Sequence, residues 1–178
     1  MLKIDPRENQ NYLRKLSLND LAAFENYYLS NASHLAPWEP VYQVDYRTRL
    51  SNIWLEDQNG TAFYFGIFSI EDDELLGIFN FTGITRGNFQ SCYLGYSLAE
   101  EAQGMGIMTR ALQIGIRFMF EDQGIHRIIA CYQPENLKSQ RLLQRLEFEQ
   151  EGYAKSYLFI AGKWQDHVLT ALVNPGQR

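Results

Sequence analysis

The spacing of apolar residues changes within residues 93–109. In residues 93–99 apolar side chains alternate with small or polar ones, a pattern that predicts a β-strand. Residues 100–106 are polar and glycine-rich, and from Ile107 onward apolar residues recur at helical spacing. This stretch therefore predicts a strand, a glycine loop and a helix in direct succession.

The same patterns divide the rest of the chain into short strands and helices. Strands are expected at residues 12–16, 61–70, 74–84, 89–98, 125–132, 148–160 and 164–172. Helices are expected at residues 18–29, 44–56, 107–123 and 135–146, with a loop at residues 31–41. The strand at residues 148–160 should bend near Ala154 or Lys155. Residues 161–163 should form a hairpin turn, and residues 174–178 should be loose.

This order of elements predicts an α/β (α+β) fold. We expect a mixed, mostly antiparallel sheet of about seven strands with about four flanking helices. Short polar links indicate an antiparallel meander across residues 61–98. The strands on either side of the glycine loop and its helix should be parallel neighbours, joined by a right-handed crossover. No linker or repeat is evident, so residues 1–178 are expected to form one domain, with a core at about residues 13–172.

Composition and charge exclude several classes of protein. The 178 residues are 46% hydrophobic, enough for a real core, and the net charge of −5 argues against direct nucleic-acid binding. A basic partner, such as a basic protein or a polyamine, remains compatible with that charge. No apolar run approaches the roughly 20 residues of a membrane span, and residues 1–8 do not resemble a signal peptide. The two cysteines and three histidines lack ligand spacing, which predicts reduced thiols, no metal and a cytoplasmic location.

The glycine loop is a candidate anion site. Gly104 and Gly106 would let the backbone approach a ligand, and the first N–H groups of the following helix lack partners within it. These donors and the positive end of the helix dipole suit a phosphate or pyrophosphate. The loop lacks the third glycine of a dinucleotide fingerprint and the Gly-Lys-Ser/Thr of a P-loop. A glycine turn without any ligand is the alternative.

The loop resembles the acetyl-CoA signature Q/R-x-x-G-x-G/A of the GCN5-related N-acetyltransferase (GNAT) superfamily. Gln103 and Gly106 match it, whereas Met108 replaces the last small residue. Asn136 and Ser139 resemble the N-x-x-S step of the RimJ/RimL type, and L-E-F at residues 146–148 matches its L-G-F with one substitution. The segments P-W-E-P, I-H-R-I, E-G-Y-A-K and G-K-W-Q-D-H-V are similar to the branch that acetylates ribosomal-protein alanine.

The resemblance implies a GNAT fold that binds acetyl-CoA as a co-substrate in the gap between two splayed parallel strands. The pyrophosphate would lie on the backbone of residues 103–108, that is Gln103, Gly104, Met105, Gly106, Ile107 and Met108. The pantetheine arm would bond to the strand that carries Tyr96 and Leu98. We expect a bulge near Gly95, where a freed N–H of Gly95 or Tyr96 could polarise the thioester carbonyl.

Asn136 and Ser139 are the candidate catalytic residues, and both are also expected at the cofactor. Asn136 could bond the pantetheine amide, cap the following helix, or do both. Ser139 is placed to give a proton to the leaving thiolate, or is only a solvated helix residue. An α-amino group has a pKa near 8 and asks little of a base. A carboxylate could remove the proton through a water, and Glu100, Glu101 and Glu135 lie near the strand ends. Acidic loop residues are usually only solvated, so no base is named.

The acceptor is less defined than the cofactor. The leading hypothesis is acetyl transfer to the N-terminal α-amino group, with alanine the expected first residue, of a ribosomal protein. The alternatives are a small-molecule amine, such as a polyamine or an antibiotic, or a ribosome-assembly factor in which acetylation is incidental. Trp38 and the aromatic residues Phe63, Tyr64 and Phe65 could line an acceptor cleft or belong to the core. The sequence leaves open whether the protein is a monomer or a homodimer.

Overall fold

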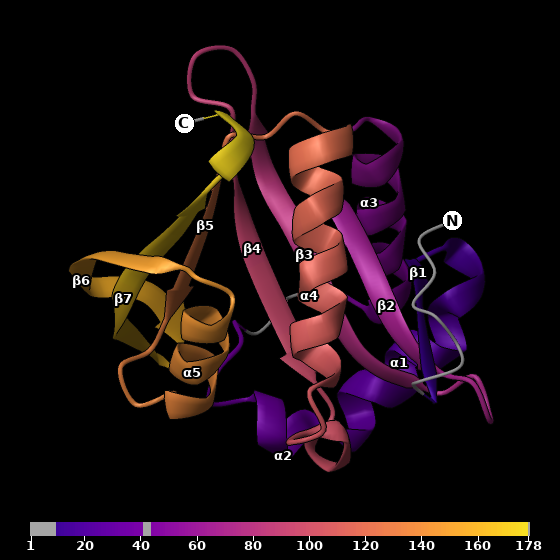
Figure 1. Cartoon of the computed structure of the whole chain (residues 1–178). Helices are drawn as coiled ribbons and strands as arrows, with labels where there is room; N and C mark the ends of the chain where they lie inside the picture. Colours follow the sequence, from indigo (N-terminus) through magenta and orange to yellow (C-terminus); the bar gives the residue numbers. More distant parts are fainter. Residues whose placement is uncertain (1–9, 41–43, 178) are drawn as a thin grey trace.

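A computed structural model describes residues 10–40 and 44–177 of the chain (Figure 1). The expectation for residues 1–8, the last residue of the loop expected at residues 31–41 and the last residue of the tail expected at residues 174–178 lie outside the described residues. The strands are β1 Asn11–Lys15, β2 Phe63–Ser69, β3 Leu75–Thr85, β4 Ser91–Leu98, β5 Arg127–Tyr132, β6 Glu149–Ile160 and β7 Lys163–Val173. The α-helices are α1 Leu21–Ser30, α2 Ala32–Leu35, α3 Tyr46–Gln58, α4 Ile107–Arg117 and α5 Leu137–Arg145.

The seven strands form one open sheet in the order β1-β2-β3-β4-β5-β7-β6. Strands β1 to β4 pair antiparallel in sequence order, and β7 pairs antiparallel with both β5 and β6. Strands β4 and β5 are parallel, as expected of the strands that flank the loop and its helix. The expected mixed, mostly antiparallel sheet is therefore confirmed.

Helices cover both faces of the sheet (Figure 1). In this view α4 and α5 lie in front of it, and α1 and α3 lie behind. Each layer has its own apolar cluster. Leu112 of α4 packs with Phe79 and Phe81 on the front face, and Phe24 of α1 and Leu50 of α3 pack on the rear face. Because β4 belongs to the centre of the sheet, its two faces look into two different layers.

Several elements differ in detail from the expectation. The loop expected at residues 31–41 contains the short helix α2. The helix expected from residue 18 starts as a 3-10 turn, Leu18–Asp20, and the one expected to reach residue 123 ends in a π-helical turn, Phe118–Asp122. Asn174, expected in a loose tail, is buried and donates its backbone N–H to His126 O at 2.8 Å. The tail prediction is wrong there because the chain end pairs with the start of β5.

The last two strands match the expected hairpin. β6 shifts register between Ala154 and Leu158, and Ser156 has a φ of 49°, so the expected bend is confirmed. Ile160 pairs with Lys163 across the expected turn.

Candidate active site

The gap between β4 and β5 is the central feature of the site. Pairing between these strands runs from Ser91↔Arg127 to Tyr93↔Ile129 and then stops, although both strands continue. Figure 1 shows the two strands diverging toward the end that carries the glycine loop. The expected splayed pair is thus present, and a length of β4 lies next to no strand on its β5 side.

The hydrogen-bond alternation along β4 identifies which backbone groups face this gap. Ala99 N donates to Leu76 O on the β3 side at 2.8 Å, and Gln90 O accepts from His126 N on the β5 side at 2.8 Å. Backbone groups of successive residues in a strand point to opposite sides. The N–H and C=O groups of Tyr96 and Leu98 therefore point into the gap, as an added extended ligand would require.

The bulge expected near Gly95 is not there. Gly95 pairs regularly with Asn80 of β3, and the register shift between β3 and β4 lies instead between Thr82 and Thr85. By the same alternation, the backbone groups of Gly95 point to β3. The gap opens because β5 leaves β4, so β4 needs no bulge of its own, and the N–H that points into the gap is that of Tyr96 rather than that of Gly95.

The glycine loop has the backbone conformation that its sequence requires. Gly104 and Gly106 have φ values of 79° and 71°, in the left-handed region that favours glycine. Gly106 caps α4, so the N–H groups of Ile107 and Met108 belong to the first, unpaired helical turn. The side chain of Met108 is only 6% exposed and packs in the core, so this departure from the signature leaves the turn clear.

Gln103 links the loop to two other elements. Its side-chain amide lies 2.7 Å from His34 Nε2 of α2, and its Oε1 accepts from Lys138 Nζ of α5 at 2.6 Å. Its backbone N–H donates to Glu100 O at 3.3 Å, which leaves the N–H groups from Gly104 onward for an anion. Sequence reasoning missed the positive charge of Lys138 at this loop.

A second missed cation is Arg110, one turn into α4. Its Nη1 donates to Met105 O at 3.1 Å, so the guanidinium folds back over the loop. A basic residue at this spacing from a glycine loop is the signal that could have identified it. Together with Lys138, it adds positive charge at the end of the gap.

Tyr96 and Ser139 bring two hydroxyl groups together on the α4–α5 side of the sheet. Tyr96 Oη lies 2.5 Å from Ser139 Oγ, and Ser139 is only 8% exposed, so it is not a solvated helix residue. Burial raises the pKa of Tyr96, which keeps the phenol protonated as a donor. The sequence pattern indicated a role for the backbone of Tyr96 but none for its hydroxyl group.

Asn136 caps α5. Its Oδ1 accepts from Ser139 N at 3.0 Å, and this bond fixes the turn that carries Ser139. The cap occupies only the side-chain oxygen, so the capping and cofactor interpretations of Asn136 do not conflict.

Carboxylates and aromatics near the gap are distributed differently from the expectation. Glu100, Glu101 and Glu135 are exposed. Phe63 and Phe65 are buried in the core, so the cleft interpretation is wrong for them. On the α1 side, the half-buried Glu39 hydrogen-bonds to the side chain of Ser97 of β4, a contact that sequence patterns did not indicate.

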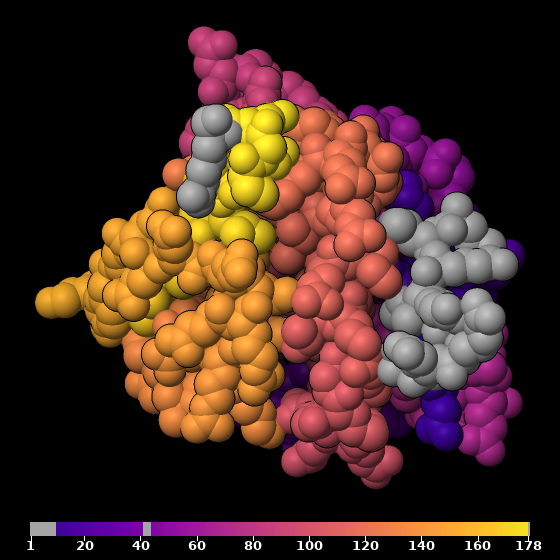
Figure 2. All heavy atoms as spheres, viewed as in Figure 1, coloured from indigo at the N-terminus to yellow at the C-terminus, as the bar shows by residue number. Residues whose placement is uncertain are grey.

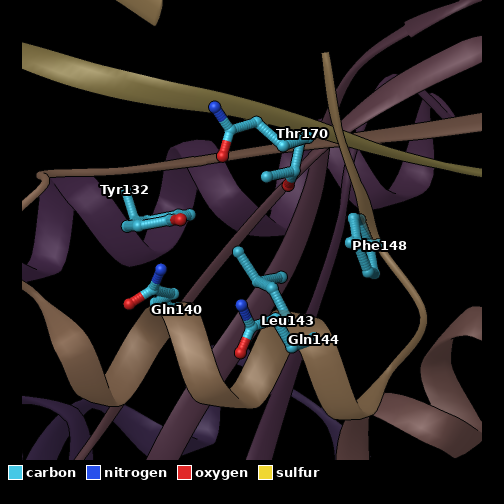
Figure 3. A pocket seen from close by; sticks show the side chains of 7 residues that line it. Tyr132, Gln140, Leu143, Gln144, Phe148 and Thr170 are labelled. Atoms are coloured by element: carbon cyan, nitrogen blue, oxygen red, sulfur yellow. The ribbon is translucent and has the colours of Figure 1, made fainter. Parts of the chain in front are cut away.

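A small pocket lies between α5 and strands β5, β6 and β7 (Figure 3). It measures about 100 Å³ and is lined by residues that include Tyr132 of β5, Gln140 of α5 and Thr170 of β7. Pockets that hold small organic ligands usually measure at least about 300 Å³. The surface indentation between α5 and the N-terminal end of α4, visible in Figure 2, follows the strand gap instead.

Neither metal binding nor a membrane-spanning helix is indicated within the described part of the chain. Over residues 10–40 and 44–177, no group of three or more His, Cys, Asp and Glu side chains could hold a metal ion. No helix of these residues is long and apolar enough to cross a membrane.

Comparisons with known proteins agree with this geometry. A family model described as an acetyltransferase (GNAT) domain matches residues 11–149, so the chain belongs to the GNAT acetyltransferase family. The chain is 49% identical to ribosomal protein uS5-alanine N-acetyltransferase of Escherichia coli (strain K12) over 156 residues, which cover 84% of this chain and 80% of that protein.

Solved structures give the same result. The ribosomal-protein-S5-alanine acetyltransferase of Vibrio fischeri matches with a TM-score of 0.91 and 37% identity, covering 96% of each chain. Mycobacterium smegmatis RimJ, in complex with CoA-disulfide, matches with a TM-score of 0.85 and 32% identity, over 93% of this chain and 83% of that chain. The protein is an acetyltransferase with the GNAT fold.

Proposed function

We propose that this enzyme transfers the acetyl group of acetyl-CoA to the N-terminal α-amino group of a ribosomal protein, with alanine as the first residue. The observation that carries the proposal is the 49% identity to the Escherichia coli uS5-alanine enzyme over 80% of its length. The acidic net charge of −5 suits a basic ribosomal acceptor. The cytoplasm, where ribosomal proteins are made, is the location that this proposal implies.

The residues of the gap fit acetyl-CoA. The N–H groups from Gly104 to Met108 would bind its pyrophosphate, with Lys138 and Arg110 adding positive charge. Tyr96 and Leu98 would bond the pantetheine arm as a neighbouring strand does. Asn136 would use its side-chain N–H groups for a pantetheine carbonyl while its oxygen caps α5.

The same residues support transfer by direct attack of an amine. The backbone N–H of Tyr96 is placed to stabilise negative charge that develops on the thioester carbonyl oxygen. The hydroxyl pair of Tyr96 and Ser139 is placed to protonate the leaving sulfur. No covalent enzyme intermediate is needed, because the amine itself is the nucleophile.

The test measures CoA release from acetyl-CoA with peptides that differ only in the first residue. The panel includes alanine, serine and methionine at that position, a peptide with a blocked N-terminus and an internal lysine, and spermidine. We expect fast release with the alanine peptide and none with the blocked peptide. Mass spectrometry should place the acetyl group on the terminal nitrogen.

Other outcomes would redirect the proposal. Release with spermidine alone would indicate a small-amine acetyltransferase. If Ser139→Ala abolished transfer while a strain that carries it still assembled ribosomes as the wild type does, under conditions in which deletion impairs assembly, the assembly-factor alternative would be favoured.

A further inference from the structure

The segment that carries Glu39 lies across the rear of the strand gap. Its backbone is fixed by α2, since Trp38 N and Glu39 N both donate to Leu35 O, at 2.9 and 3.1 Å. Pro37 O accepts from Gln133 Nε2, just beyond β5, at 2.9 Å. Two residues later, the Glu39 side chain meets β4. The segment therefore contacts β4 and the residue that directly follows β5.

The carboxylate of Glu39 is held by a short chain of hydroxyl groups. Tyr27 Oη of α1 donates to Ser97 Oγ at 3.0 Å, and the Ser97 hydroxyl in turn hydrogen-bonds to the Glu39 carboxylate. Burial raises the pKa of Glu39, whereas Ser97 and the charges of Arg49 and His34 act in the opposite direction. A carboxylate with a raised pKa is a stronger base than a solvated one.

The two faces of β4 place this carboxylate opposite the hydroxyl pair. Side chains of successive strand residues point to opposite faces, so Tyr96 meets Ser139 on the α5 side while Ser97 meets Glu39 on the α1 side. A thioester in the gap would thus have proton donors on one side and a carboxylate on the other. An amine that attacks from the α1 side would expel sulfur toward the hydroxyl pair.

We infer that Glu39 is the catalytic base of the proposed acetyl transfer, receiving a proton from the acceptor's α-amino group. This inference rests on the proposed function. The amine nitrogen forms a bond to the acetyl carbon, the carbon–sulfur bond breaks, and Glu39 takes one N–H proton. The sulfur takes a proton from the Tyr96–Ser139 pair. After transfer Glu39 therefore carries one extra proton and the pair lacks one, and exchange with water returns both to their starting states before the next turnover.

The primary test replaces Glu39 with Gln, which keeps the shape and removes the base. We expect kcat to fall about 100-fold, within the range that a general base contributes, while the Kd of acetyl-CoA stays at the wild-type value. The matched control is Glu56→Gln, which removes an exposed carboxylate of α3 and should leave kcat unchanged. A Glu39→Gln enzyme with at least half the wild-type kcat would overturn the inference.

A second readout separates a base from a structural role. Added formate should restore part of the kcat of Glu39→Ala, because a small carboxylate can occupy the space left by the side chain. If kcat is lost and formate restores nothing, Glu39 acts only structurally and the inference is wrong. Should the Glu39 variants fail to fold, Ser97→Ala covers the case. This variant keeps the Glu39 carboxylate and removes the hydroxyl that orients it, so kcat should fall. An unchanged kcat would contradict the assignment of Glu39 as the base.

Failure of this inference can be distinguished from failure of the proposed function. The wild-type enzyme is first assayed with the acceptor panel, and the variants are then assayed with whichever amine it acetylates. If the wild-type enzyme does not acetylate the alanine peptide but acetylates another amine, the proposed acceptor is rejected. The role of Glu39 can then still be tested with that other amine. Full alanine-peptide activity in Glu39→Gln rejects the base alone. A wild-type enzyme that acetylates no amine rejects both.

Discussion

Glu147 occupies a backbone conformation that is unfavourable for a residue with a side chain. It follows α5 with a φ of 63°, while Phe148 N donates to Leu143 O at 3.0 Å to close the helix end. The left-handed conformation costs a residue with a Cβ atom roughly 1–2 kcal/mol. We therefore expect Glu147→Gly to raise the free energy of unfolding by about 1 kcal/mol, after the greater flexibility of glycine in the unfolded chain is subtracted.

Urea denaturation measures this gain. Glu147→Ala is the matched control, because it removes the same carboxylate but keeps the Cβ atom. It should not share the gain. Equal stabilisation by alanine would mean that the carboxylate, and not the backbone strain, is responsible.

The hydroxyl pair of Tyr96 and Ser139 gives a second prediction at the scale of single residues. If either hydroxyl can protonate the sulfur, each single variant, Tyr96→Phe or Ser139→Ala, should lower kcat about tenfold, and the double variant about 1,000-fold, within the range for general acids. The Kd of acetyl-CoA reports whether binding is preserved. If the kcat of the double variant equals that of the less active single variant, the two hydroxyls act as one relay.

At the scale of elements, Asp20 joins the 3-10 turn before α1 to strand β1. Its carboxylate accepts from Arg14 Nη1 and Nη2 at 2.7 and 2.6 Å and from Ser17 N at 2.7 Å. The pair is only partly buried, because the Arg14 side chain is 26% exposed. Asp20→Asn should therefore lower the free energy of unfolding by about 2 kcal/mol, within the range for hydrogen bonds to a charged group. The matched surface variant Asp122→Asn should leave that free energy unchanged.

The same pair predicts a dependence on pH. Burial opposes ionisation of Asp20, but the hydrogen bonds from Arg14 and Ser17 outweigh it, and the pKa is lowered. Because the folded pKa lies below the unfolded one, near 3.9, the stabilisation is complete above the unfolded value. It is lost as the pH falls toward the folded value. Urea midpoints measured from pH 6 to pH 2 should fall more steeply for wild type than for Asp20→Asn.

The elements around the glycine loop were predictable because their signals are local. The alternation before Gly104 and the helical spacing after Gly106 specify a strand and a helix. A helix that connects two strands lets them pair in parallel, and β4 and β5 do so. The two glycines of the loop account for its two left-handed backbone positions.

Contacts between residues distant in sequence could not be predicted in this way. Glu39 meets Ser97, and Pro37 meets Gln133, across 58 and 96 positions, and the segment between α1 and α3 has no periodic pattern. The prediction of a bulge near Gly95 was wrong for the same reason, since the register shift between β3 and β4 lies elsewhere. Gly95 tolerates a bulge, but pairing with Asn80 across the sheet decides against one.

At the scale of the whole molecule, net charge should govern capture of the acceptor. The chain carries −5, and proteins that bind ribosomal RNA are basic, so long-range attraction should speed their encounter. The screening length falls from about 8 Å at 0.15 M salt to about 3 Å at 1 M. The kcat/KM for a whole basic ribosomal protein with N-terminal alanine should therefore fall about tenfold as salt rises over this range.

A short neutral peptide with the same first residues separates this attraction from the chemistry. It meets the same Tyr96, Ser139 and Glu39 side chains but carries no extended positive charge. Its kcat/KM should change little with salt once acetyl-CoA is saturating. If the peptide and the whole protein lose activity in parallel, salt acts on the transfer step itself, and the overall charge does not guide the acceptor. If only the whole protein loses kcat/KM, the effect of salt lies in association, because the reacting α-amino group is the same in both substrates.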